Sequence, residues 1–235
     1  MIVVGIETST PHTSVAVGTD LEILGEVAIS GKARQEVVTP ALDRVLAWTG
    51  VERAQIGGVA VGIGPGLFTG LRVGVETGKT LAQVLGAPIL GIPSLDALAY
   101  AVRTTSRTIC AVLDARRGEV FHALYRPVPG GVMRVTEHAV ASPDHLVADL
   151  EVSPDDVLCV GNGAILYRNA LEQLGPRIEF ASATVAHPSA AALVELAAPR
   201  FLREEHDDLF GVVPMYLRRS DAEIAWDERA GRAPA

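Results

Sequence analysis

The sequence predicts an α/β protein of two lobes, built by duplication of one unit. Three strands, a helix, a strand and a helix occupy residues 2–85, and a similar order begins again at residue 108. The apolar strand at 57–63 passes through a glycine-rich loop into a helix at 70–85, as in βα units. A chain of 235 residues that is 49% hydrophobic is long enough to bury two modest cores.

The first unit begins with three apolar runs that are separated by turn-forming residues. These runs predict a strand meander at 2–7, 13–18 and 23–29. A helix near 34–49 follows, because apolar residues recur there at helical spacing before Gly50. Its apolar face consists of Val38, Leu42, Val45 and Leu46. The unit ends with a strand at 57–63, a helix at 70–85, a strand at 88–92 and a helix from Ser94.

The second unit repeats this order after a polar linker at 103–107. Strands are expected at 108–113, at 119–125 and within 131–140, and a helix and a strand at 157–160 follow. The turn Asp114–Gly118 joins the first two of these strands. We therefore expect lobes at 1–104 and 105–218, and a solvated or flexible polar tail at 219–235.

Composition favours an ordinary soluble protein. The net charge is −8, and the only adjacent basic pairs are Arg116-Arg117 and Arg218-Arg219, which disfavours polyanion binding by this chain alone. Cys110 and Cys159 lie far apart in apolar runs and are expected to be buried free thiols. The start lacks a basic leader, and no apolar run approaches the roughly 20 residues of a membrane span. A cytoplasmic protein is expected.

The glycine-rich loop between residues 59 and 72 could serve a phosphate or form a tight turn. Glycines such as Gly64 and Gly66 allow close backbone approach, and the helix that follows carries partial positive charge at its start. The residues of this loop and of the first turn that would face a phosphate are Glu7, Thr8, Ser9, Gly64, Pro65, Gly66 and Thr69.

Two phosphate motifs fit the loop poorly. Gly78-Lys79-Thr80 looks like the end of a P-loop, but Val73 stands where the first glycine belongs and the lysine lies within a helix. A dinucleotide fingerprint would use loosened glycine spacing, and no acid ends the strand at 88–92 to bind a ribose hydroxyl. The alternative that the loop is only a tight structural turn between strand and helix therefore remains.

Three motifs together resemble the family of proteins that make threonylcarbamoyladenosine in tRNA. They are Gly5–Thr10 at the first turn, the loop at 64–66, and the segment Gly86–Ser94, with weaker support from 160–163 and 214–218. This resemblance implies the duplicated fold of actin, the sugar kinases and the Hsp70 ATPase, in two lobes.

The resemblance points to the noncatalytic branch of the family, TsaB (YeaZ), rather than to the catalytic branch, TsaD. In the catalytic branch the helix after Pro93 carries two histidines four residues apart, which hold a metal ion. Ser94 and Leu98 occupy these positions here, and the six histidines of the chain include no pair at three- or four-residue spacing. No catalytic residue and no metal are therefore expected.

Family membership also implies partners. They are TsaD as the catalytic subunit, the ATPase TsaE as a third component, and a second copy of the chain when it is alone. ATP or ADP would be bound by the assembly rather than by the isolated chain, and tRNA would be contacted through the complex.

Glu7 has two interpretations. In nucleotide-binding members of the fold, an acid at this turn organises a hydrated magnesium ion. Arg116 and Arg117 stand where the second phosphate hairpin would need small residues. A structural acid that caps its own turn is therefore favoured.

Gly70, Gly74 and Gly78 recur every four residues and form a row on one face of their helix. A mid-helix glycine costs about 1 kcal/mol relative to alanine, so close packing is expected along the row. The helix could pack on its own sheet or against a partner helix, and the resemblance favours the partner. The predicted interface residues are Val38, Leu42, Val45, Gly70, Leu71, Gly74, Val75 and Gly78. Many relatives carry a histidine where Arg34 stands, so contacts near that position are not carried over.

Three other functions remain open. A small-molecule kinase or ATPase would use the same fold. A protease lacks support, because the chain has no His-Glu-x-x-His or Gly-x-Ser-x-Gly motif. A binding module for an unrelated partner would show no motif at all.

Overall fold

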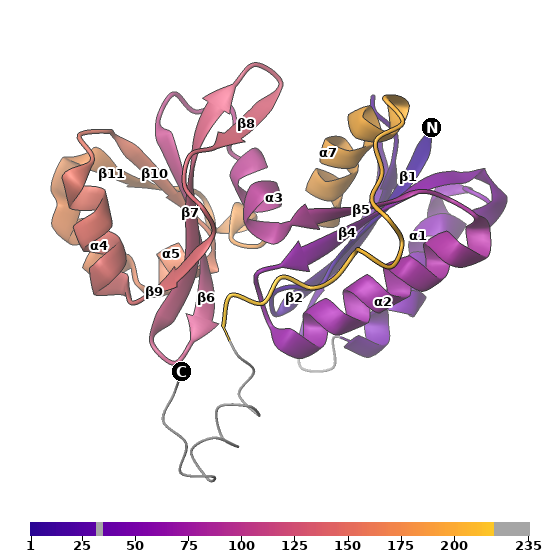
Figure 1. Ribbon diagram of the computed structural model, residues 1–235, viewed down its shortest axis with the longest axis horizontal. Coiled ribbons are helices and arrows are strands. Elements are labelled where there is room, and N and C mark those ends of the chain that lie inside the picture. The colour runs from indigo at the N-terminus through magenta and orange to yellow at the C-terminus, as the bar shows by residue number, and fades with distance from the viewer. Residues whose placement is uncertain (32–34, 219–235) are drawn as a thin grey trace, which may run out of the picture.

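The computed structural model describes residues 1–31 and 35–218. The predicted tail at 219–235 and the position of Arg34 lie outside the described residues. Two β-sheets stand side by side, with helices between them and on their outer sides (Figure 1). No helix in the described part of the chain is long and apolar enough to span a membrane.

The first sheet has the strand order β3-β2-β1-β4-β5. Its strands are β1 (Ile2–Glu7), β2 (His12–Gly18), β3 (Ile23–Ser30), β4 (Ile56–Gly64) and β5 (Ile89–Pro93). The central strand β1 pairs antiparallel with β2 and parallel with β4. It is almost wholly buried, as its apolar sequence requires for a strand that is covered on both faces.

Two helices cover the outer face of this sheet, α1 (Val38–Thr49) and α2 (Phe68–Leu85) (Figure 1). Their apolar stripes form one core with the side chains of β1, β2 and β4 on that face. Each helix ends at a glycine in the left-handed conformation, Gly50 with φ 69° and Gly86 with φ 62°. Short 3₁₀ turns, Gln35–Val37 and Arg53–Gln55, flank α1.

The second sheet has the order β11-β10-β6-β7-β8, and β9 pairs with β7. Its strands are β6 (Thr108–Arg116), β7 (Glu119–Val128), β8 (Gly131–Arg134), β9 (Ala139–Ala141), β10 (Val157–Val160) and β11 (Ile178–Phe180). Its outer face is covered by α4 (Pro143–Val152), α5 (Asn162–Leu166) and α6 (Arg168–Leu171). The 3₁₀ turns Glu172–Arg177 and Ala183–Val185 precede and follow β11.

When β9 is left out and strands are numbered within each unit, both sheets show the same order, 3-2-1-4-5. The predicted duplicated α/β fold is therefore confirmed. The last helix of each unit lies between the two sheets: α3 (Ser94–Tyr100) packs mainly on the second sheet, and α7 (Ala190–Leu202) packs on the first. The alanine-rich face of α7 comes so close to β1 that a Cβ at Gly5 would overlap the carbonyl oxygen of Ala190.

After α7 the chain returns across both units in an irregular segment, residues 207–218, which we call the strap. Asp207 N–H donates to the Ile89 carbonyl at 2.9 Å, and Met215 N–H donates to the Ile63 carbonyl at 2.7 Å. At its end, Arg218 Nη1 donates to Glu119 Oε2 at 2.8 Å in the second unit. The expected lobe boundary at 104/105 falls between α3 and β6, but α7 and most of the strap contact the first sheet.

Candidate functional site

The turn after β1 encloses a carboxylate. Glu7 is fully buried; its Oε1 accepts the Ser9 N–H at 2.6 Å, and its Oε2 accepts the Ser94 hydroxyl at 2.9 Å. Burial raises the pKa of Glu7, and these hydrogen bonds oppose the rise. A Cβ at Gly62 would overlap the carboxylate, so β4 closes the remaining side. Both oxygens are engaged and Glu7 caps its own turn, which agrees with the structural interpretation.

The glycine-rich loop directs most of its polar groups into the protein. Gly64 N–H donates to Ser94 Oγ at 3.2 Å, and Leu67 N–H donates to the Ser9 carbonyl at 2.7 Å. The Gly64–Pro65 peptide is cis. Thr8 Oγ1 donates to the Gly70 carbonyl at 2.8 Å. Among the residues expected to face a phosphate, Glu7, Thr8, Ser9, Gly64 and Pro65 are buried, Thr69 is exposed, and Gly66 lines the cleft between the units.

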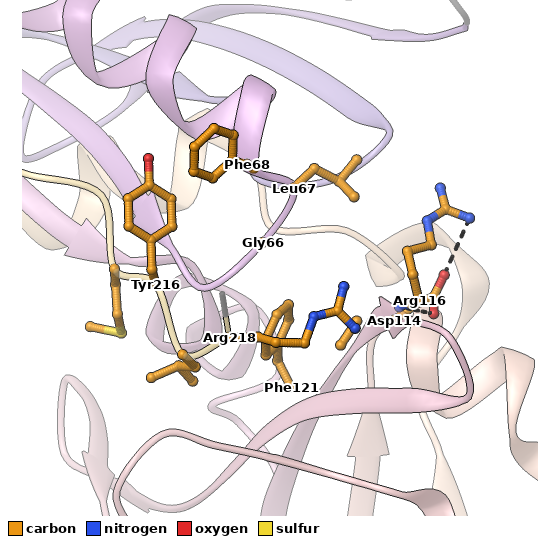
Figure 2. Close-up of a pocket in the computed structure, with 11 residues that line it drawn as sticks. Gly66, Leu67, Phe68, Asp114, Arg116, Phe121, Tyr216 and Arg218 are labelled. Carbon is orange, nitrogen blue, oxygen red and sulfur yellow. Dashed lines mark hydrogen bonds and ion pairs between the residues drawn. The ribbon is translucent and has the colours of Figure 1, made fainter. Parts of the chain in front are cut away.

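That cleft contains a small pocket of about 80 Å³ (Figure 2). It lies between the start of α2, the β6–β7 hairpin and the strap, which contributes Met215, Tyr216, Leu217 and Arg218 to its lining. Ligand pockets usually measure about 300–1,000 Å³. The pocket beside the strap is smaller than this range.

The β6–β7 hairpin turns through two arginines in the left-handed region, Arg116 with φ 66° and Arg117 with φ 55°. Asn and Gly favour this conformation, and arginine adopts it rarely. Arg116 N–H donates to Asp114 Oδ1 at 2.8 Å, and its guanidinium lies 3.5 Å from Oδ2 of the same carboxylate. Arg117 also has an interaction partner.

The glycine row of α2 faces inward. A Cβ at Gly70 would overlap the Thr8 carbonyl oxygen, a Cβ at Gly74 would overlap the Thr8 hydroxyl, and a Cβ at Gly78 would overlap Val61. The interpretation of the row as an external docking groove is therefore wrong, because the row lets α2 approach its own sheet. Val38, Leu42, Val45, Leu71 and Val75 are likewise buried in the core of the first unit.

A groove does lie on the outer side of the same two helices. It has a volume of about 470 Å³. It is lined by Thr39, Leu42, Asp43, Arg53, Glu76, Thr77, Thr80, Leu81, Val84 and Leu85. Val84 is 78% exposed, and Trp48, farther along α1, is 72% exposed under the Arg44 guanidinium. The sequence signal for this surface was Val84, an exposed apolar residue on α2. The predicted interface was assigned to the glycine row instead and did not include this residue.

The two positions at which the resemblance implies metal-binding histidines in the catalytic branch lie inside this protein. Ser94 is bonded to Glu7 and Gly64, and Leu98 packs in the core against the second sheet. In the described part of the chain, no group of three or more His, Cys, Asp or Glu side chains could hold a metal ion.

The repeated strand order, the helices α3 and α7 between the two sheets, and the small pocket in the cleft define a two-lobed protein of the actin and sugar kinase fold class. The family described as tRNA N6-adenosine threonylcarbamoyltransferase, TsaD, matches residues 22–226. The chain belongs to this family and, within it, to TsaB, as the following relatives show.

The tRNA threonylcarbamoyladenosine biosynthesis protein TsaB of Bacillus subtilis is 30% identical over 97% of this chain and 99% of its own length. TsaB of Escherichia coli is 25% identical over 99% of this chain and all of its own length. The solved structure of YeaZ from Pseudomonas aeruginosa is similar with a TM-score of 0.78 and 25% identity, over 92% of this chain and 99% of that one.

Proposed function

We propose that this chain is a noncatalytic subunit of the machinery that forms threonylcarbamoyladenosine beside the anticodon of tRNA. It would hold the catalytic subunit, TsaD, in an active arrangement. Similarity to TsaB proteins over nearly the full length supports this role. The observation that carries the noncatalytic part is the pair Ser94 and Leu98, which fill the family's ligand positions with a buried hydroxyl and a core side chain. Because tRNA is the substrate, the proposed location is the cytoplasm.

The outer groove between α1 and α2 is the proposed docking surface. Apolar side chains at Leu81, Val84 and Leu85 lie beside polar ones at Asp43 and Glu76, which suits an amphipathic helix of a partner. TsaD shares the family of this chain, so its corresponding helices would meet α1 and α2 and form a four-helix contact. In the absence of TsaD, a second copy would bury the same face.

Nucleotide is assigned to the assembly, with TsaE as the ATPase component. Two features support the absence of independent nucleotide binding: the small pocket under the strap, and the engagement of Glu7 by Ser9 and Ser94. A kinase or ATPase of this fold would require the strap to leave the cleft. A protease finds no support in the thiols, because Cys110 and Cys159 are both buried.

The test is size-exclusion chromatography with light scattering on this chain alone and mixed with the TsaD of the same organism. A Val84→Arg variant places a charge in the groove. Arginine has a high helix propensity, so α2 is expected to keep its structure. Val152→Arg on α4 is the matched control, since Val152 is 87% exposed on the other unit.

We expect a heterodimer that Val84→Arg weakens at least tenfold and Val152→Arg leaves unchanged. Equal effects of both variants would refute the groove as the docking surface. Absence of any heterodimer with the unmodified chain would refute the scaffold role, and turnover of ATP by the isolated chain would then favour a kinase.

A further inference from the structure

The fold gathers arginines that are far apart in the sequence. Arg116 and Arg218 line the same pocket, one from the β6–β7 hairpin and the other from the strap (Figure 2). Arg117 follows Arg116 at the hairpin tip. Arg72 lies outside the lining of this pocket, and its Nε donates to the Tyr216 hydroxyl at 3.1 Å. We call Arg116, Arg117 and Arg218 the arginine patch.

The arginine patch brings three arginines together on an acidic protein, whose net charge is −8. Asp114 pairs with Arg116, Glu119 pairs with Arg218, and both Arg117 and Arg218 have further interactions. A guanidinium has five N–H donors in a fixed fork, so pairing with one carboxylate leaves donors for another acceptor. The patch can therefore keep its ion pairs and still bind a phosphate.

Aromatic rings lie beside the patch. The Phe68 and Tyr216 rings stack at 5.0 Å between centroids, and the Arg72 guanidinium lies 4.1 Å from the centre of the Phe68 ring. Tyr216 is partly exposed. Arginines beside a partly exposed aromatic ring, here Tyr216, are a combination that can bind the phosphates and unstacked bases of RNA.

The backbone of the β6–β7 hairpin is strained at its turn. Two successive arginines occupy the left-handed region, although asparagine or glycine would adopt that turn with less strain. The Arg116 side chain is 53% exposed, so packing in a core does not explain its identity. Strained residues that contribute little packing point to a binding role.

We propose that the arginine patch contacts the RNA backbone of tRNA in the assembled complex. The contact is electrostatic and independent of sequence, and it orients the tRNA relative to this subunit. This inference rests on the proposed function, because the chain as a whole is acidic and the catalytic subunit supplies the remaining tRNA contacts.

The test compares tRNA binding by the complex of this chain with TsaD, measured by fluorescence anisotropy at several salt concentrations. The variant is Arg116→Asn with Arg117→Asn, because asparagine keeps the left-handed turn while both charges are removed. The matched control is Arg126→Asn with Arg203→Asn, which removes two exposed charges at the far end of β7 and the end of α7.

We expect the hairpin variant to lose about tenfold in affinity and to lower the slope of log K against log salt by about 1–2, for cognate and noncognate tRNA alike. The control should change neither quantity. Chromatography should show that both variants still form the complex.

Unchanged tRNA affinity in the hairpin variant would overturn the inference and leave the proposed function intact. A loss of TsaD binding without a change in tRNA affinity would also overturn it, in favour of an acidic protein segment at the patch. If the unmodified chain forms no complex, tRNA binding by the isolated chain at low salt decides the inference with the same variants.

Discussion

The inward glycine row makes a quantitative prediction about Gly78. In an exposed helix, Gly→Ala would stabilise by about 1 kcal/mol. Here the new methyl group would overlap Val61 Cγ1, and Val61 is fully buried, so it has no free space to enter. Overpacking of this kind costs about 2–3 kcal/mol, which leaves Gly78→Ala destabilised by about 1–2 kcal/mol.

A second substitution distinguishes this packing from other causes. Val61→Ala alone should lose about 2 kcal/mol through its cavity, but in the double variant the methyl group introduced by Gly78→Ala would fill that cavity. We therefore expect the Gly78→Ala, Val61→Ala protein to lose about 1 kcal/mol, well short of the sum of the single variants.

Urea unfolding followed by circular dichroism measures all three variants. Glu76→Gly against Glu76→Ala is the control, since Glu76 is exposed on the same helix and glycine there should be about 1 kcal/mol less stable. Additive losses, or stabilisation by Gly78→Ala alone, would refute the inward packing of the row.

Three further predictions concern titratable groups that are buried or partly buried. Burial and the neighbouring charge of His12 lower the pKa of His187 from 6.5 to about 4. The folded state therefore binds fewer protons than the unfolded state, and stability that is present above pH 6.5 is lost as the pH falls towards 4. After discounting for the partial exposure of this side chain, we expect His187→Gln to remove about 1–2 kcal/mol of this acid sensitivity in unfolding curves. The pKa of Glu7 is raised by burial, so its effect has the opposite sign: stability falls as pH rises from 4.5 through the raised value, and Glu7→Gln should flatten that fall in the same assay. The hydrogen bond between Cys110 and Cys159, together with burial, raises the pKa of the Cys110 thiol well above its usual range. Both cysteines are buried, so we expect neither to react with a thiol reagent until urea unfolds the protein, and rapid labelling of the native state would contradict this.

The sequence predicted most of the first unit because its local signals agree. The strands at 2–7, 13–18 and 23–29 correspond to β1, β2 and β3, and the glycine that was expected to end the first long helix caps α1. Alternating apolar runs and glycine caps act over a few residues, and they need no tertiary context.

The second unit shows where local signals end. The strand expected within 131–140 is split into β8 and β9, which pair with different parts of β7. The short strand β11 and the helix α7 were not predicted. Nothing in the sequence of α7 shows that it packs on the first sheet, because its alanine-rich surface would fit either sheet.

The candidate site was harder to predict because its evidence is three-dimensional. Regular glycine spacing indicates a close approach but not whether the approaching atoms belong to the same chain. In the sequence, Arg116-Arg117 and Arg218 are separated by about a hundred residues and read as scattered charges. Only the path of the strap brings them to one pocket.

The helices α3 and α7 and the strap connect the two lobes, which affects how the subunit would work. An enzyme that closes over its ligand needs lobes that move relative to one another. Here α3 packs on the sheet of the other unit, α7 returns to the first, and the strap bonds Ile63 in one unit and Glu119 in the other. Opening the cleft would break these contacts together. A subunit whose lobes are held by such contacts would lose little conformational entropy when a partner docks on α1 and α2, which supports the proposed scaffold role.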